Sequence, residues 1–158
     1  RSAAGDPVCA YGNGRQHRIG LRDYVSNDIL GSEMREVIFV GSSQKDLAAF
    51  PVEARLEATF ALDEARAGRK SLSAKPMKGF GGASVLEIVC DDDGNTYRAV
   101  YTVRFKDAIY VLHAFQKKAK RGIATPQREL ELIGQRLKSA ANISAARVRL
   151  EKRQGDEV

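Results

Sequence analysis

The chain has 158 residues, of which 43% are hydrophobic and 29% are charged, as in ordinary globular domains. No segment approaches the roughly 18–20 apolar residues of a membrane span, and the N-terminus lacks a signal-peptide pattern. We therefore expect a cytoplasmic protein with no membrane contact. The net charge of +6 and the pI near 9.5 favour an anionic partner: nucleic acid, the ribosome or an acidic protein.

The cysteines and histidines do not have the spacing of metal ligands. Cys9 and Cys90 lie far apart, and His17 and His113 are the only histidines. We expect no metal site and no cofactor. Cys90 is interpreted as a buried strand residue.

Residues 1–33 differ in composition from the rest of the chain. They contain scattered glycines and balanced charges without sustained periodicity, and Met34 directly precedes the first strand-like run. We predict an N-terminal extension over residues 1–33, a folded domain over residues 34–141 and a C-terminal tail over residues 142–158. A genuine N-terminal subdomain is the alternative for the first segment.

A strand and two helices are predicted next. Residues 36–40 (EVIFV) form the strand, and Ser42 or Ser43 can cap a helix over residues 45–50. Pro51 suits the first position of a second helix, which ends at Gly68. In this helix Val52, Leu56 and Phe60 recur at i, i+4 and i+8, so we expect them to face the core. Three further residues broaden this stripe: Ala61, Leu62 and Ala65.

Residues 69–82 (RKSLSAKPMKGFGG) are predicted to be a loop with lysines and no acidic residue. Such a loop can hold a phosphate, although it lacks the GxxxxGK[ST] pattern of a P-loop. A solvated connector is the equally weighted alternative.

Residues 84–118 are predicted to form an antiparallel meander of three strands. Asp-Gly and Asn within residues 91–95 favour the first turn, and Lys106-Asp107 marks the second. One face of the middle strand should meet the helices through Tyr97, Ala99, Tyr101, Val103 and Phe105. The other, open face should carry Arg98, Val100, Thr102 and Arg104.

The register of the last hairpin decides which residues lie beside Arg98. A two-residue loop places His113 and Phe115 there, and a three-residue loop places Gln116 and Lys118 there. The sequence leaves both alternatives open.

A basic segment leads from the meander into the last helix. Between residues 115 and 128 the chain has five basic residues and no acid. Thr125 and Pro126 form a helix start, and Leu130, Ile133 and Leu137 form the inward stripe of the helix. Beyond about Ala141 the pattern weakens, so we expect a fraying helical tail with its last residues disordered.

Three segments carry a resemblance to a known family. They are KPMKGFGG (75–82), TYRAVYTV (96–103) and HAFQKKAKRGIATPQRELELI (113–133). The chain thereby resembles the RelE/ParE superfamily of type II toxins, and within it the HigB-like, phage-related branch. The resemblance implies an α+β fold, with an N-terminal strand and helix hairpin packed on an antiparallel sheet and a C-terminal helix.

The resemblance also implies an activity. The RelE/ParE superfamily includes toxins that cut translated mRNA in the ribosome without a metal, by attack of the 2′-hydroxyl on the adjacent phosphate. That reaction needs a base, cations for the charged phosphate and an acid for the leaving oxygen. The expected partners are the ribosome, mRNA and a cognate helix-turn-helix antitoxin.

Site residues follow by position in these segments. Arg98 would stabilise the phosphate, Lys118 would lie near the leaving group, and Lys75 and Lys78 would assist the nucleophile. His113 is a candidate base, with a structural role as the alternative. The predicted RNA-binding residues are Lys117, Lys120, Arg121 and Arg104.

One departure from RelE concerns tyrosine. RelE has a tyrosine on its C-terminal segment, whereas residues 126–140 contain none, so Tyr101 or Tyr110 would have to replace it. Two other functions stay open: inhibition of DNA gyrase, as in ParE, and non-catalytic binding of RNA or the ribosome.

Overall fold

The computed structural model describes residues 34–82, 84–118 and 124–156. The predicted extension over residues 1–33 and the predicted RNA-binding residues Lys120 and Arg121 lie outside the described residues. No helix in these three ranges is both long and apolar enough to cross a membrane.

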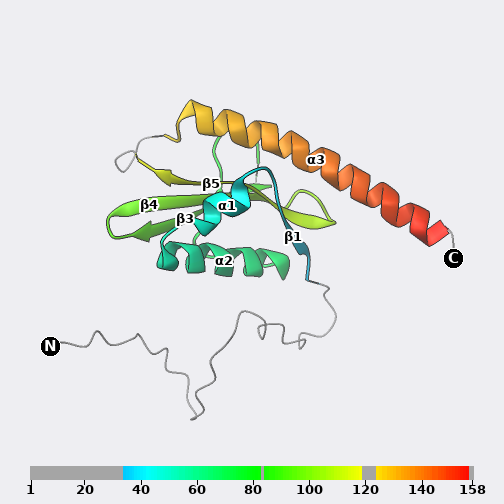
Figure 1. The fold of residues 1–158 in the computed structure, drawn as a ribbon, viewed down its shortest axis with the longest axis horizontal. Helices are drawn as coiled ribbons and strands as arrows, with labels where there is room; N and C mark the ends of the chain where they lie inside the picture. Colours follow the sequence, from blue (N-terminus) through cyan, green and yellow to red (C-terminus); the bar gives the residue numbers. More distant parts are fainter. Residues whose placement is uncertain (1–33, 83, 119–123, 157–158) are drawn as a thin grey trace, which may run out of the picture. The chain divides into compact units, whose positions relative to one another are not determined.

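The described chain forms a five-stranded sheet covered by helices on both faces (Figure 1). The elements are β1 (Glu36–Phe39), α1 (Ser43–Ala48), α2 (Val52–Arg66), β2 (Ala74–Pro76), β3 (Val85–Asp92), β4 (Asn95–Thr102), β5 (Ala108–Lys117) and α3 (Gln127–Asp156). The strand order is β1-β5-β4-β3-β2, in which β1 runs parallel to β5 and every other pair is antiparallel. The predicted α+β fold is confirmed, and β2 adds a short edge strand inside the segment predicted to be a loop.

The two faces of the sheet contribute to separate hydrophobic cores. On one face, Ala99 and Tyr101 of β4 belong to the core formed with α1 and α2. On the other face, Val100 belongs to a second core, which includes Ile133 of α3. The prediction that Val100, Thr102 and the arginines share an open face is therefore wrong, because α3 packs on that side.

Helix α2 contacts the sheet through only part of the predicted stripe. Its buried side chains are small apart from one leucine: Ala54, Ala58, Ala61, Leu62 and Ala65. Ala61, Leu62 and Ala65 are thus buried as predicted, whereas the main predicted row of Val52, Leu56 and Phe60 is 57%, 58% and 59% exposed. Small side chains let the helix approach the sheet closely, and the large apolar side chains consequently point away from it.

The β3–β4 hairpin has the predicted turn. Asp93 and Gly94 lie between the strands, and both have a positive φ, of 46° and 76°. This is the combination that a two-residue turn of type I′ requires, and Asp-Gly is among its favoured sequences.

The β4–β5 hairpin has a bulge that sets its register. Val100 pairs with His113 but Tyr101 pairs with Val111, so Leu112 is the extra residue. Beyond the bulge, Arg98 pairs with Phe115. The alternative with His113 and Phe115 beside Arg98 is thus confirmed, although the strands are joined by residues 103–107 and not by two residues.

Helix α3 continues through the predicted helical tail. It runs for 30 residues from Gln127 to Asp156, whereas fraying was expected beyond about Ala141. Its second half is fastened by Ser144, whose hydroxyl donates to Asp107 at 2.6 Å, and by Arg147, which forms ion pairs with Asp107 (3.2 Å) and Glu36 (2.6 Å). These polar contacts, which hydrophobic periodicity does not register, explain why the helix continues.

Candidate active site

A buried carboxylate lies at the centre of the candidate site. Glu87 of β3 is on the α3 side of the sheet, and only 8% of its side chain is exposed. Arg98 of β4 donates a short hydrogen bond to one carboxylate oxygen, and Nζ of Lys75 lies 3.7 Å from the other. The pairing of Lys75 with Glu87 across β2 and β3 brings a residue of the predicted lysine loop into the sheet.

Lys117 of β5 completes this group. It lies opposite Thr96, one step along the face from the pair of Arg98 and Phe115. Partial burial lowers the pKa of Lys117, and the charges of Arg98 and Lys75 lower it further, whereas Glu87 opposes them. A lysine with a lowered pKa can exchange a proton more readily near neutral pH. We call Arg98, Lys75 and Lys117, arranged around Glu87, the cationic cluster.

The other described basic residues of the predicted site lie outside the cationic cluster. Lys118 directly follows the end of β5 and is exposed. Together with Lys117 and Arg128 it lines a cavity of about 350 Å³. Lys78 is exposed in the segment after β2. Arg104 is also exposed, beyond the end of β4 that is remote from the β3–β4 hairpin.

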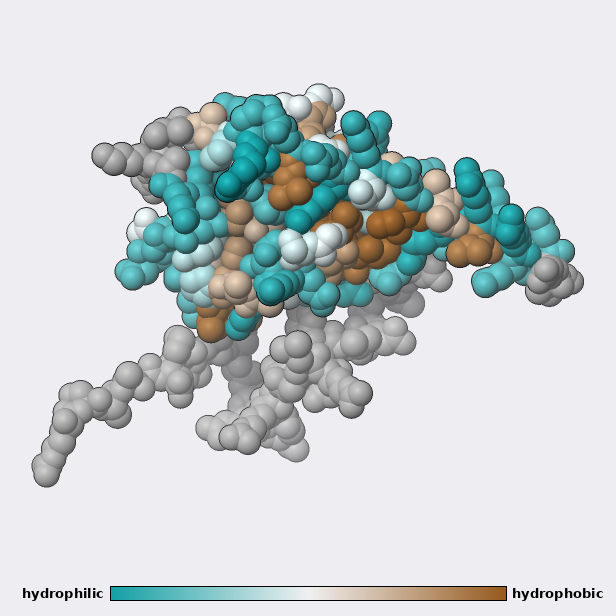
Figure 2. Space-filling view, turned by 45° about the horizontal axis from the view of Figure 1, so that its top comes forward, coloured by the Kyte–Doolittle hydropathy of each residue, from teal (hydrophilic) through white to brown (hydrophobic). Residues whose placement is uncertain are grey.

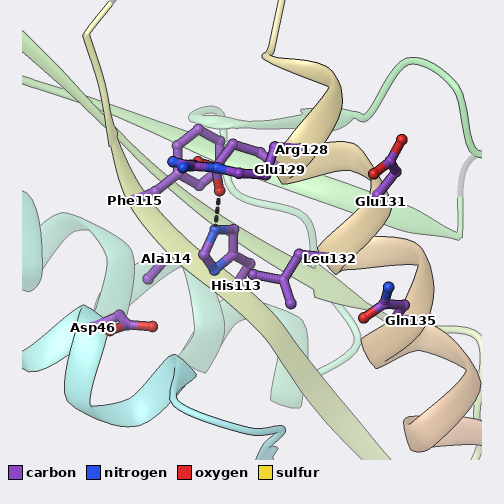
Figure 3. Close-up of a pocket in the computed structure, with 9 residues that line it drawn as sticks. All are labelled: Asp46, His113, Ala114, Phe115, Arg128, Glu129, Glu131, Leu132 and Gln135. Carbon is purple, nitrogen blue, oxygen red and sulfur yellow. Dashed lines mark hydrogen bonds and ion pairs between the residues drawn. The ribbon is translucent and has the colours of Figure 1, made fainter.

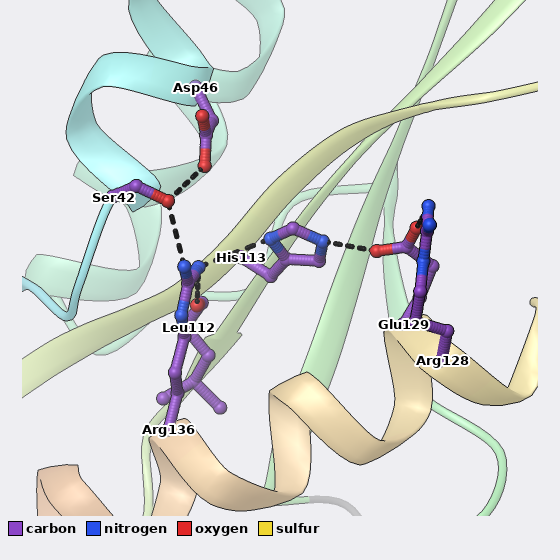
Figure 4. Close-up of polar contacts among 7 residues, drawn as sticks. All are labelled: Ser42, Asp46, Leu112, His113, Arg128, Glu129 and Arg136. Atoms are coloured by element: carbon purple, nitrogen blue, oxygen red, sulfur yellow. Dashed lines mark hydrogen bonds and ion pairs between the residues drawn. The ribbon is translucent and has the colours of Figure 1, made fainter.

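His113 belongs to a chain of polar contacts that joins three elements (Figure 4). Its Nε2 lies 2.6 Å from Glu129 of α3, and its Nδ1 lies 3.2 Å from Nη1 of Arg136. Arg136 also donates to the Leu112 carbonyl at 2.9 Å and to the Ser42 hydroxyl at 2.8 Å. The contacts therefore hold α3 against β5 and against the start of α1.

These contacts determine the tautomer of His113. A guanidinium can only donate, so Nδ1 must accept from Arg136 and Nε2 must carry the proton. Nε2 then donates to Glu129. Burial alone would raise the pKa of Glu129, but hydrogen bonds with His113 and Arg128 outweigh burial and lower it. Because both ring nitrogens are occupied, His113 has no free lone pair with which to act as a base.

A surface cavity of about 540 Å³ opens beside His113 (Figure 3). Asp46 of α1 lies on one side, and Glu129, Glu131 and Gln135 of α3 lie on the other. The ring of His113 stacks on that of Phe115, with centroids 5.0 Å apart. The acidic lining distinguishes this cavity from the cationic cluster and makes it a poor site for phosphate.

The tyrosines proposed as replacements are unsuited to the chemistry. Tyr101 and Tyr110 are both fully buried. Burial raises the pKa of Tyr101 to about 12, and burial together with the hydrogen bond to Asp107 raises that of Tyr110 to about 12. Neither hydroxyl can reach a substrate in this structure.

Three site residues were missed by the sequence reasoning: Glu87, Glu129 and Arg136. A signal existed for Glu87, since it is the one acidic residue within the apolar run VLEIVC. No signal marked Glu129 and Arg136, because charged residues on a helix ordinarily indicate its solvated side.

The α3 side of the molecule is largely hydrophilic (Figure 2). Hydrophobic atoms appear there as patches within a predominantly polar surface. Such a surface is compatible with a polar, charged substrate.

The comparisons place the chain in a family. Residues 45–138 match the family described as Phage derived protein Gp49-like (DUF891), and none of the curated proteins matches the chain. The match begins inside α1 and includes α2, every strand except β1 and the first part of α3, so it spans the cationic cluster and the contacts of His113 with Glu129 and Arg136. The chain therefore belongs to the Gp49-like family of phage-derived proteins, a toxin-like family associated with RelE-like toxins.

Proposed function

We propose that the protein is a HigB-like toxin of a type II toxin–antitoxin system, and that it cuts mRNA on translating ribosomes. The observation that carries the proposal is the cationic cluster, in which three strands direct Lys75, Arg98 and Lys117 to one side of the sheet. Family membership supports the toxin role, and the positive net charge suits an RNA substrate.

The proposed reaction is an internal transfer of the phosphoryl group. The 2′-oxygen attacks the adjacent phosphorus, the bond from phosphorus to the 5′-oxygen breaks, and the products are a 2′,3′-cyclic phosphate and a 5′-hydroxyl. One proton leaves the 2′-hydroxyl and one is delivered to the 5′-oxygen. Between these two transfers, the phosphate carries extra negative charge that cations stabilise.

The residues divide these tasks. Arg98 and Lys75 stabilise the phosphate, and Glu87 holds both of their side chains in place. Lys117 transfers a proton, since its pKa is lowered and it lies on the face of Arg98. Lys118 and Lys78, both exposed, bind the RNA backbone on either side. His113 positions α3 through Glu129 and Arg136.

The test is cleavage of a defined mRNA on purified translating ribosomes. We expect Lys117→Ala, and the double variant Glu87→Gln/Arg98→Gln, to lose at least about 100-fold in rate. Lys106→Ala is the matched control, because Lys106 is exposed at the opposite end of the hairpin, and its rate should be unchanged. Circular dichroism of each variant excludes unfolding.

Three results would overturn the proposal. The first is full cleavage by the Lys117→Ala protein. The second is ribosome binding with intact mRNA, which would identify a non-catalytic module. The third is loss of DNA gyrase supercoiling without mRNA cleavage, which would identify an inhibitor of ParE type.

We also propose a cognate helix-turn-helix antitoxin and a cytoplasmic location. Expression of the chain should arrest growth, and co-expression of a neighbouring helix-turn-helix protein should restore it. Growth arrest that no neighbouring gene relieves would contradict the toxin–antitoxin arrangement.

A further inference from the structure

Helix α2 carries an uncovered row of large apolar side chains. Val52, Leu56 and Phe60 are each more than half exposed, and their spacing of four residues places them along one side of the helix. We call this row the α2 stripe. Single exposed apolar residues are ordinary on protein surfaces, but three large ones in a row on one helix indicate a binding face.

The charges beside the α2 stripe indicate the kind of partner. Glu53 and Glu57 lie next to the stripe on one flank and are exposed. Neither forms an ion pair with a described residue, and Glu57 also interacts with the Cys90 thiol. On the other flank, Arg55 donates to the Ala48 carbonyl and Arg66 donates to the Arg35 carbonyl. Arg66 also pairs with Asp63 at 3.3 Å, whereas Arg55 keeps its positive charge, so the α2 stripe has an acidic flank at Glu53 and Glu57 and a basic flank at Arg55.

We propose that the α2 stripe docks an amphipathic helix of a partner protein. The partner helix has apolar residues at spacings of three and four, and lysines or arginines along the flank that meets Glu53 and Glu57. This surface is separate from the cationic cluster, because α1 and α2 cover one face of the sheet and the cluster lies on the other. The inference is thus independent of the proposed nuclease activity.

Two other occupants fit the surface less well. RNA is disfavoured, because Glu53 and Glu57 repel phosphates. A second copy of the chain is disfavoured in the antiparallel arrangement of two α2 helices, because the twofold axis places each acidic flank opposite its own copy. A basic partner helix avoids both repulsions.

The experiment uses the full chain and two designed helical peptides of equal length. Both carry leucines at the spacing of the α2 stripe, and they differ only in flanking lysines or glutamates. We expect the lysine peptide to bind at least about tenfold more tightly by fluorescence anisotropy. If the net charge of +6 determined binding, the glutamate peptide would bind more tightly than the lysine peptide. Tighter binding of the lysine peptide therefore reports attraction to the local acidic flank.

Variants locate the binding surface. Leu56→Ser and Phe60→Ser should each weaken the lysine peptide by at least about tenfold, and Glu53→Lys/Glu57→Lys should reverse the preference between the peptides. Leu72→Ser is the matched control, since Leu72 is a fully exposed leucine outside the stripe. Unchanged melting temperatures establish that every variant folds.

Four outcomes would overturn the proposal. The first three are tighter binding of the glutamate peptide, equal loss of binding in Leu72→Ser, and no binding of either peptide. Self-association by sedimentation that Leu56→Ser abolishes would also overturn it, because the occupant would then be a second copy of the chain.

Discussion

Removal of Arg98 should destabilise the fold as well as the candidate site. In Arg98→Ala, the buried carboxylate of Glu87 keeps only Lys75, at 3.7 Å, and the side chain of Lys75 is 56% exposed. Breaking a buried ion pair costs about 3–5 kcal/mol. Because Lys75 still compensates part of the charge of Glu87, we expect a loss of unfolding free energy near the lower end of this range, about 3 kcal/mol. For a domain of this size, that corresponds to a fall in Tm of roughly 10 °C.

The assay is urea denaturation of Arg98→Ala, Glu87→Gln and the double variant Glu87→Gln/Arg98→Ala. The double variant leaves no unpaired buried charge, because the side chain of Lys75 is more than half exposed, so we expect it to lose only about 1 kcal/mol in unfolding free energy. Since Glu87→Gln alone also costs stability, the expected coupling between the two positions is at least about 2 kcal/mol. A loss below about 0.5 kcal/mol in Arg98→Ala, or additive losses across the cycle, would refute a stabilising buried pair.

The remaining predictions concern the polar contacts of α3. Burial alone would raise the pKa of Asp107, but hydrogen bonds from Ser144 and Tyr110 outweigh burial and lower that pKa. The Asp107 carboxylate therefore stabilises the fold fully at pH values above its ordinary pKa of 3.8, and this stabilisation is lost as the pH falls through the lowered pKa. Asp107→Asn should cost about 2 kcal/mol at pH 7, with a gap to wild type in urea denaturation that closes below about pH 4; a gap independent of pH would contradict this. His113→Gln should lower the Tm but retain the pH profile of mRNA cleavage, whereas loss of one limb of that profile would identify His113 as the base. Gly41→Ala should cost about 1–2 kcal/mol, because Gly41 has a φ of +60° and an added Cβ would lie 2.9 Å from Nε of Arg136; an unchanged Tm would contradict it.

Much of the fold could be predicted because local signals agree with it. Asp93-Gly94 specifies its turn, alternation specifies the strands, and Ile133 marks the inward side of α3. The stripe of α2 could not be assigned, because the helix carries an alanine-rich stripe as well as one of large apolar residues. Periodicity detects both stripes equally and does not reveal which of them suits the close distance between helix and sheet.

The candidate site was predicted in composition more than in arrangement. Arg98 and Lys75 were identified by their positions in the segments that carry the family resemblance, but the bulge at Leu112 determines that Lys117 lies on their face. A bulge depends on long-range pairing and leaves no periodic trace in the sequence. The position of Arg136 between three acceptors is likewise a product of tertiary packing.

The parallel pairing of β1 with β5 has a consequence for synthesis of the chain. Val37 pairs with Ile109, so the first strand emerges from the ribosome long before its partner exists. At a translation rate of about 5–20 residues per second, roughly 4–14 s pass between the synthesis of β1 and that of β5. Because β5 also carries Lys117, the sheet and the cationic cluster are completed only when β5 has been made. A nascent chain interrupted before residue 117 would therefore lack Lys117 and with it the complete cationic cluster.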